Sequence, residues 1–136
     1  MSGTSEGPLL RALDAIQIPV PDLDEALAFY CDRLGHELKW RNERSAGLRL
    51  PGSEAELVLE TGRPELEPNM LVESVEDAVR RFVAAGGTIE AEPSDIPVGR
   101  VAIVRDPFGN RLVLLDLSKG RYVTDVAGNV TGVEPN

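Results

Sequence analysis

The chain has 136 residues, of which 42% are hydrophobic and 27% charged, and its formal net charge is −9. This length fits one domain with its own core. Residues 51 to 96 carry eleven acidic residues and three arginines. Such a field repels nucleic-acid phosphates, so we expect no nucleic-acid partner, and it favours a cationic ligand.

No stretch is long and apolar enough for a membrane span, and the start lacks the pattern of a secretion signal. The single cysteine, Cys31, excludes an internal disulfide and suits a reducing compartment. We therefore expect a cytoplasmic protein with no membrane partner. Residues 1–10 are polar at their start and are predicted to form a flexible tail.

The first predicted elements are a strand over residues 13–20 and a helix that follows it. Ile16, Ile18 and Val20 alternate with Ala15, Gln17 and Pro19, which is typical of a strand with two different faces. Asp22 is the expected N-cap of the helix and Gly35 its stop. Three further strands are predicted over residues 36–42, 46–51 and 55–61.

The second half repeats this order. Residues 72–87 align with residues 20–35 without a gap at an offset of 52, so that Ser74 replaces Asp22 as the N-cap. A strand is predicted before this helix over 67–72, and strands after it over 88–92, 99–105 and 111–117. Residues 92–100, with two prolines and a glycine, are predicted to be a loop over a pocket mouth.

The repeat predicts an α+β fold of two βαβββ modules, with mixed sheets curved around a central cavity and one main helix per module. Module one covers 11–61 and module two 67–117, within a single domain over 11–117. Residues 118–136, with the turn-forming pair Gly128-Asn129, are predicted to be a tail or a small hairpin.

Two βαβββ units, the stretch VPDLDEALAFY…LG after the first strand and DPFGN before the last strand resemble the vicinal-oxygen-chelate superfamily. That group includes glyoxalases, bleomycin-resistance proteins and extradiol dioxygenases. Its metal-using members hold one divalent ion with four side chains, usually histidines and glutamates. The resemblance covers roughly residues 11 to 117, and the fold hosts many chemistries.

The resemblance places the four metal positions at Ala15, Glu60, Glu67 and Val113, with Glu56 as the alternative to Glu60. Alanine and valine bind no metal, and two carboxylates alone would hold Mg²⁺ or Ca²⁺ only loosely. We therefore expect no metal cofactor, and Glu60 and Glu67 remain weak candidates for a divalent ion.

Other side chains are predicted to line the cavity. Gln17 and Asn69 share the strand phase of Glu60 and Glu67, and Trp40 is placed either in the core or against a flat ligand. Arg49 or Arg100 is expected to pair with Glu60 or Glu67, which would weaken any preference for a cation. His36 stands outside the ligand positions, and Cys31 is expected to be a small core thiol. The predicted ligand-binding residues are therefore Gln17, Trp40, Glu60, Glu67, Asn69, Arg100 and Val113.

The favoured function is metal-independent binding of a small molecule, cationic or aromatic, in an acidic cavity, as in the bleomycin-resistance branch that the sequence resembles. The alternative is a metal-dependent lyase, isomerase or dioxygenase with a non-standard carboxylate site. A third possibility is a structural or regulatory module whose pocket has closed. The resemblance also implies a homodimer.

Overall fold

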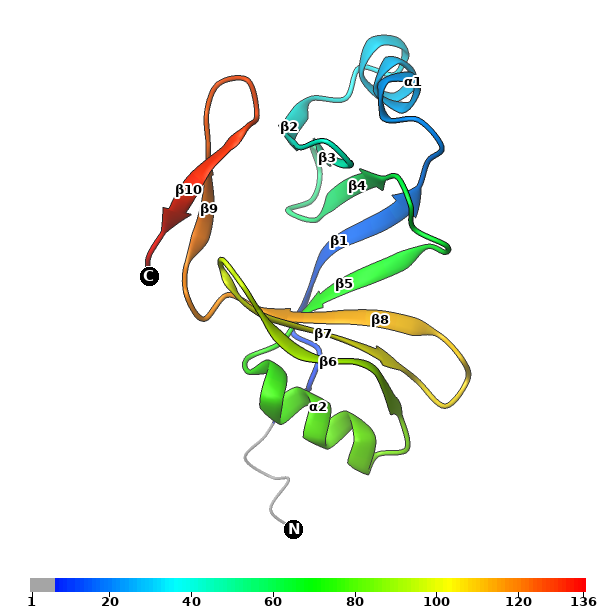
Figure 1. Cartoon of the computed structure of the whole chain (residues 1–136), viewed down its shortest axis with the longest axis vertical. Helices are drawn as coiled ribbons and strands as arrows, with labels where there is room; N and C mark the ends of the chain where they lie inside the picture. Colours follow the sequence, from blue (N-terminus) through cyan, green and yellow to red (C-terminus); the bar gives the residue numbers. More distant parts are fainter. Residues whose placement is uncertain (1–6) are drawn as a thin grey trace. The chain divides into compact units, whose positions relative to one another are not determined.

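The computed structural model describes residues 7–136, and the chain divides into two compact units. We call Asp14–Pro68 together with Tyr122–Glu134 the module-one unit. We call Asn69–Arg121, together with residues 7–13 and 135–136, the module-two unit. Helices and strands follow one another as the α+β prediction requires, which confirms the fold class (Figure 1).

The module-one unit contains a mixed sheet of four strands in the order β2-β3-β4-β1. β1 (Ala12–Pro19) and β4 (Glu56–Glu60) run parallel, whereas β3 (Ser45–Arg49) runs antiparallel to both β4 and β2 (Leu38–Arg41). The parallel pair requires a crossover, and helix α1 (Leu23–Leu27) lies within it.

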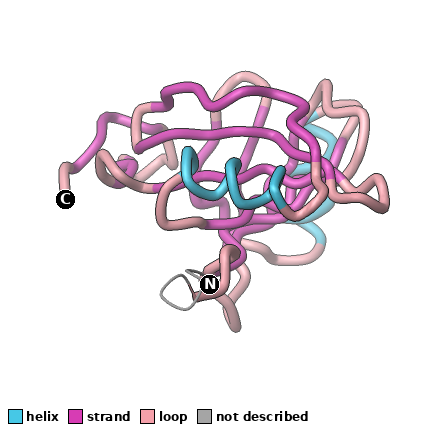
Figure 2. The backbone as a smooth tube through the Cα atoms, turned by 90° about the horizontal axis from the view of Figure 1, so that it is seen from below, coloured by secondary structure: helices cyan, strands magenta, loops and turns pink. Residues whose placement is uncertain are grey.

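The second set of strands repeats this arrangement in the order β5-β8-β7-β6 and lies in the module-two unit, except for Glu67 and Pro68 at the start of β5. β5 (Glu67–Leu71) runs parallel to β8 (Arg111–Asp116), and β7 (Gly99–Arg105) is antiparallel to both β8 and β6 (Thr88–Ile96). Helix α2 (Val75–Ala84) contacts β6, β7 and β8, and Figure 2 shows the helix beside strands of this unit.

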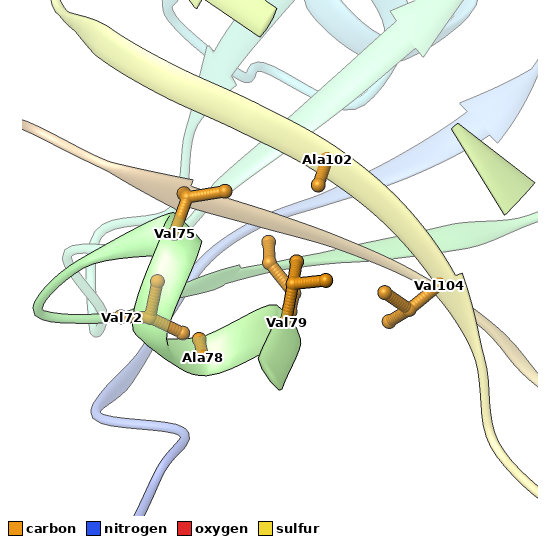
Figure 3. Close-up of a cluster of buried hydrophobic side chains, with 7 residues drawn as sticks. Val72, Val75, Ala78, Val79, Ala102 and Val104 are labelled. Atoms are coloured by element: carbon orange, nitrogen blue, oxygen red, sulfur yellow. The ribbon is translucent and has the colours of Figure 1, made fainter. Parts of the chain in front are cut away.

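Each helix covers an apolar strand face, as the alternation predicted. In the module-two unit, Val75, Ala78 and Val79 of α2 pack with Val72, Ala102, Val104 and Leu114 (Figure 3). In the module-one unit, Leu23 and Ala26 of α1 pack with Ala46, Leu48 and Leu59. Ile18 and Val20 pack against the module-one cluster, and Met70 and Leu112 pack against the module-two cluster. Burial of these side chains supplies the main stabilisation of each unit.

The two helices begin alike but end differently. The side chains of Asp22 and Ser74 accept hydrogen bonds from the backbone N–H groups of Glu25 and Asp77, which confirms both predicted N-caps. The first helix then widens into a π-helix, η2 (Ala28–Arg33). The glycine with positive φ is Gly35 in module one but Gly86 in module two, so the spacing from cap to glycine is 13 residues against 12. The π-helical turn absorbs this one extra residue.

A buried aspartate holds the start of α2 from outside the helix. Asp116 accepts hydrogen bonds from the backbone N–H groups of Val75, Arg100 and Ser118 and from the Ser118 hydroxyl. Burial opposes its charged form, but these donors outweigh that effect and hold the pKa of Asp116 below its usual value. Gly99 is required beside it, since an added Cβ would lie 2.1 Å from the Asp116 carbonyl oxygen.

The loop predicted over residues 92–100 is wrong, because β6 continues to Ile96 and β7 begins at Gly99. Only a two-residue turn separates them. β6 is the last strand in its sheet order, and its pairing shifts register between Ala91 and Ser94. Pro93 falls in this irregular stretch of an outer strand, where a residue without an N–H group is tolerated. Prolines therefore mark an edge strand here rather than a loop.

Residues 121–134 form a hairpin of β9 (Arg121–Thr124) and β10 (Val130–Glu134). Its turn, DVAGN, has the same bonds as the DPFGN turn before β8. In both turns, the aspartate carboxylate accepts hydrogen bonds from the backbone N–H and the side-chain amide of the final asparagine. The glycine of each turn has a positive φ, 89° at Gly128 and 94° at Gly109. The D-x-x-G-N spacing thus encodes one turn twice.

Part of the tail predicted over residues 1–10 lies outside the described residues, namely residues 1–6. Beyond it, the carbonyl of Gly7 accepts a hydrogen bond from Arg81 of α2, and Leu9 packs against the α2 cluster. No helix in residues 7–136 is long and apolar enough to cross a membrane.

Candidate functional site

The sheet face opposite α1 in the module-one unit carries three of the predicted ligand-binding residues, Gln17, Trp40 and Glu60. Strand pairing places Gln17 of β1 beside Val58 of β4, and Val58 beside Gly47 of β3. Side chains two residues away on a strand share its face. The face therefore comprises Ala15, Gln17, Trp40, Ser45, Gly47, Glu56, Val58 and Glu60. We call this set the polar face.

Trp40 is held flat on the polar face by two neighbours. A Cβ added to Gly47 would lie 2.0 Å from the indole Nε1, so the ring occupies the space that any larger residue at position 47 would need. The Nε1–H group donates to Glu56 Oε1 at 2.6 Å, and Lys39 Nζ lies 2.9 Å from Glu56 Oε2. The indole is half-buried. Its orientation is therefore set before any ligand arrives.

The carboxyl of Asp14 interacts electrostatically with Glu56 and Lys39. Burial raises the pKa of the Asp14 carboxyl, the charge of Glu56 raises it further, and Lys39 opposes the shift. Asp14 was not predicted as a site residue, because its strand phase matches the helix-facing residues Ile16 and Ile18.

One arginine joins the two glutamates predicted to line the cavity. Arg63 donates from Nε to Glu60 Oε2 and from Nη1 to Glu67 Oε1. Glu60 Oε1 also accepts the Ser45 hydroxyl at 2.8 Å, and the Glu67 side chain is fully buried. The expected partners were Arg49 or Arg100, but Arg63 fills that role. Its position, three residues after Glu60 and four before Glu67, was the available indication.

The face opposite α2 in the module-two unit is apolar instead. Leu71 pairs with Leu115 and Leu115 with Val101, while Asn69 pairs with Val113 and Val113 with Ile103. Val113 and Leu115 are buried, and the others are half-buried. We call this set the apolar face: Asn69, Leu71, Val101, Ile103, Val113 and Leu115. It includes two predicted site residues, Asn69 and Val113.

Arg100 does not lie on the apolar face. Its strand phase is that of Ala102 and Val104, which pack on α2. Arg100 donates to Glu76 of α2 from Nε at 3.1 Å, and its Nη1 lies 3.2 Å from Asp95. The prediction of Arg100 as a ligand-binding residue is therefore corrected to a contact between strand and helix.

The residues present do not fit the family's metal. Since Gln17 corresponds to Asn69 in the repeat, and Gln17 pairs with Val58 as Asn69 pairs with Val113, the module-one equivalent of Val113 is Val58. Glu56 and Glu60 lie two residues to either side of it. The four positions thus carry Ala15, Val58, Glu67 and Val113, and Glu67 is held by Arg63. No group of three or more His, Cys, Asp or Glu side chains within residues 7–136 is arranged to hold a metal ion.

Neither His36 nor Cys31 lies on the polar face. The backbone N–H of His36 donates to the carbonyl of Tyr30 at the end of the first helix. Cys31 packs against the α1 cluster, and its pKa is raised by burial and by the charge of Asp32. A thiol with a raised pKa is a weak nucleophile at neutral pH.

A hollow of about 270 Å³ lies between residues 8–11 and the start of α2. Its arginines are engaged by neighbours: Arg11 by Glu73 at 2.9 Å, Arg80 by Asp77, and Arg81 by the carbonyl of Gly7 at 3.0 Å. The contacts of Arg11 and Arg81 stabilise the packing of residues 7–11 beside the helix, and that of Arg80 lies within α2.

The chain matches known proteins over most of its length. The profile of the Glyoxalase/Bleomycin resistance protein/Dioxygenase superfamily matches residues 12–114. A stretch of 58 residues, 43% of this chain, is 38% identical to the anthracycline biosynthesis protein DnrV of Streptomyces peucetius and spans 21% of that protein.

Solved structures show the same fold. Methylmalonyl-CoA epimerase from Mycobacterium tuberculosis superimposes with a TM-score of 0.65 at 24% identity, covering 81% of this chain and 90% of that one. Homoprotocatechuate 2,3-dioxygenase from Brevibacterium fuscum superimposes with a TM-score of 0.62 at 22% identity, covering 81% of this chain and 37% of that one. At these identities the likeness concerns the fold alone.

Proposed function

Because the chain belongs to the Glyoxalase/Bleomycin resistance protein/Dioxygenase superfamily, we propose that it binds a small planar aromatic molecule on its polar face without a metal. The observation that carries the proposal is the fixed indole of Trp40, backed by Gly47 and bonded to Glu56. A ring held in one orientation stacks on a flat ligand at little cost in conformational entropy.

The charged side chains of the polar face, together with the neighbouring Arg63 and Glu67, favour an aromatic ligand over a cationic one. Glu60 and Glu67 share Arg63, and Glu56 is paired with Lys39. A cationic ligand would have to displace these partners, whereas stacking on Trp40 leaves them in place. The acidic excess of the chain then serves solubility, the commoner role of surface acids.

Metal independence is proposed from the side chains at the four family positions. Three of these positions carry alanine or valine, which offer no donor atom. The fourth carries the carboxylate of Glu67, which already has a cationic partner in Arg63. Transition metals in proteins are held by three or four donors, commonly with nitrogen among them.

The partial match to an anthracycline biosynthesis protein supports the proposed ligand class. Anthracyclines contain a planar fused-ring system, which has the shape that stacks on an indole. We extend only this chemistry to the chain: a fused-ring aromatic compound with polar edge groups. We also propose that the protein is cytoplasmic. We further propose that it is a homodimer, which sedimentation of the purified chain would test.

Thermal unfolding with a panel of ligands tests the proposal. Fused-ring aromatic compounds, including an anthracycline, are expected to raise the Tm, and aliphatic amines are not. Trp40→Leu keeps apolar bulk but removes the planar ring, so calorimetric titration should give an affinity about tenfold weaker, equivalent to ~1.4 kcal/mol.

Phe108→Ala provides the matched control, because Phe108 is 85% exposed in the turn before β8. This variant is expected to bind like the wild type. Equal losses in both variants, or a wild type that no aromatic compound stabilises, would contradict the proposal. A stoichiometric divalent ion in the purified protein would instead support a metal-dependent enzyme.

A further inference from the structure

We infer that the turn of the β9–β10 hairpin positions the indole of Trp40, because Gly128 of that turn is seated against the backbone that carries the ring. The inference deepens the proposed function and rests on it, since it concerns how the stacking ring is held. Trp40 and residues Tyr122–Glu134 belong to the module-one unit. The hairpin therefore contributes to the polar face, although its residues were predicted only as a tail or small hairpin.

The strand that carries Trp40 is irregular. The pairing of β2 with β3 has one extra residue, Lys39, between Leu38 and Trp40. Such a β-bulge redirects side chains. Leu38 packs against the α1 cluster, whereas Lys39 and Trp40 both contact Glu56 on the polar face. A bulge also leaves part of the strand ladder unpaired, so support from outside the β2–β3 pair matters for the backbone of Trp40.

The turn of the hairpin supplies this support. β2 is the outer strand of its sheet order, and the backbone N–H of Arg41 donates to the carbonyl of Gly128 at 3.0 Å. A Cβ added to Gly128 would lie 3.3 Å from both the Lys39 carbonyl oxygen and the Trp40 Cα. Gly128 is buried, whereas the other residues of 121–132 are exposed. The buried contact of the turn therefore lies at the backbone of Trp40.

Asp125 fixes the shape of this turn. Its carboxylate accepts hydrogen bonds from the backbone N–H groups of Ala127 and Asn129 at 2.9 Å and from the side-chain amide of Asn129 at 3.3 Å. The Asn129 N–H is the main cause that lowers the pKa of Asp125, so the carboxylate stays charged at neutral pH and keeps these bonds. The turn therefore presents the Gly128 carbonyl to Arg41 in a fixed direction.

Docking of the turn and stacking of the ligand favour the same arrangement of Trp40. By thermodynamic linkage, each then stabilises the other. The amide of Arg41 reports docking, because it exchanges with solvent only when its bond to Gly128 opens. The probe is alizarin, a dihydroxyanthraquinone with the fused rings and polar edge of the proposed ligand. We expect saturating alizarin to slow exchange of this amide about fivefold or more.

The test compares Gly128→Ala with Gly109→Ala. Both place a Cβ at positive φ in a D-x-x-G-N turn, but no atom of the described residues lies within 4 Å of a Cβ added to Gly109. Trp40 is the only tryptophan, so its emission reports the ring without any ligand. We expect the emission maximum of Gly128→Ala to move to longer wavelength, because a released indole is more exposed. Its calorimetric affinity for alizarin should fall about tenfold, and Gly109→Ala should match the wild type in both.

A wild-type emission maximum in Gly128→Ala, or the same shift in Gly109→Ala, would overturn the inference. So would an Arg41 amide that exchanges equally fast with and without bound alizarin. The emission is measured without ligand. If alizarin binds to none of these proteins, the proposed function fails, and the emission still decides the role of Gly128.

If Gly128→Ala does not fold, Asp125→Ala and Asp106→Ala give the same comparison, because each removes the carboxylate that shapes one of the two turns. A shift of the Trp40 emission in Asp125→Ala but not in Asp106→Ala supports the inference, and equal emission in these two variants overturns it.

Discussion

The polar face of the module-one unit and the apolar face of the module-two unit stand at equivalent places in the repeat, yet their chemistry differs. Gln17 and Val58 pair in module one as Asn69 and Val113 do in module two. Around the first pair lie Trp40, Glu56 and Glu60, whereas Leu71, Val101, Ile103 and Leu115 surround the second. The helix-covered faces of the two units, in contrast, carry the same kinds of apolar residues.

This difference shows which part of the repeat is structural. The helix-covered faces stay alike because each must bury a helix, which any loss of apolar area would destabilise. The opposite faces are free of that requirement, so each can acquire its own chemistry. In this chain, the polar face has an oriented aromatic ring and paired charges, and the apolar face offers mainly hydrophobic contact. A functional site on this fold is therefore read from the faces opposite the helices.

The largest effect is expected from placing a charge on the apolar face. Val113→Glu would bury a carboxylate where the paired neighbours are Asn69 and Ile103. We expect a loss of about 3–5 kcal/mol in the free energy of unfolding, because a buried charge without a cationic partner is costly. Urea denaturation measures it.

Val123→Glu in the hairpin is the control, since Val123 is 41% exposed and should change stability by less than about 0.5 kcal/mol. If Val113→Glu is as stable as this control, the apolar face tolerates charge and the contrast between the two faces fails.

A smaller effect is expected from displacing the indole on the polar face. In Gly47→Ala the new Cβ would overlap the Trp40 ring, so the ring must move away from Glu56. Overpacking of this kind costs about 1–3 kcal/mol of stability. Affinity for the aromatic ligand should fall as well, which calorimetric titration would measure.

Gly52→Ala is the matched substitution, because no atom lies within 4 Å of a Cβ added there. It should leave both stability and affinity near wild type. Unchanged binding in Gly47→Ala would mean that the orientation of Trp40 has no bearing on the ligand.

The smallest effect concerns the pH dependence of Asp14. Burial and Glu56 raise the pKa of Asp14 in the folded state above its unfolded value. The charged form is therefore unfavourable in the fold, and this cost is absent below the unfolded pKa and grows as pH rises through the folded pKa. Asp14→Asn should raise the Tm at pH 7 and give no gain near pH 3.

Thermal unfolding across this range checks the prediction, with the exposed Glu54→Gln as the control. A gain that is the same at both pH values would show that charge at Asp14 is not its cause.

Much of the fold could be predicted from the sequence because its faces alternate strictly. Ile18 and Val20 in module one, and Met70 and Val72 in module two, lie on the helix-covered faces as their spacing indicated. The caps Asp22 and Ser74 were equally readable, because N-capping is a local interaction.

The site was harder to predict from the sequence, for two physical reasons. Glu56, Val58 and Glu60 share one strand phase, so only the pairing with β1 fixes which of them corresponds to Val113. Arg63 lies between two strands, where no periodicity reports the direction of a side chain. The orientation of Arg100, in contrast, follows from the alternation of β7, which places it with Ala102 and Val104.

The most direct test of the central claim uses the fluorescence of Trp40, the only tryptophan in the chain. The protein is titrated with a fused-ring aromatic compound before and after exhaustive treatment with a chelator. We predict saturable quenching with the same Kd in both samples, because stacking on the polar face needs no metal. Absence of saturable quenching, or quenching that is lost with the chelator and restored by a divalent ion, would contradict the account.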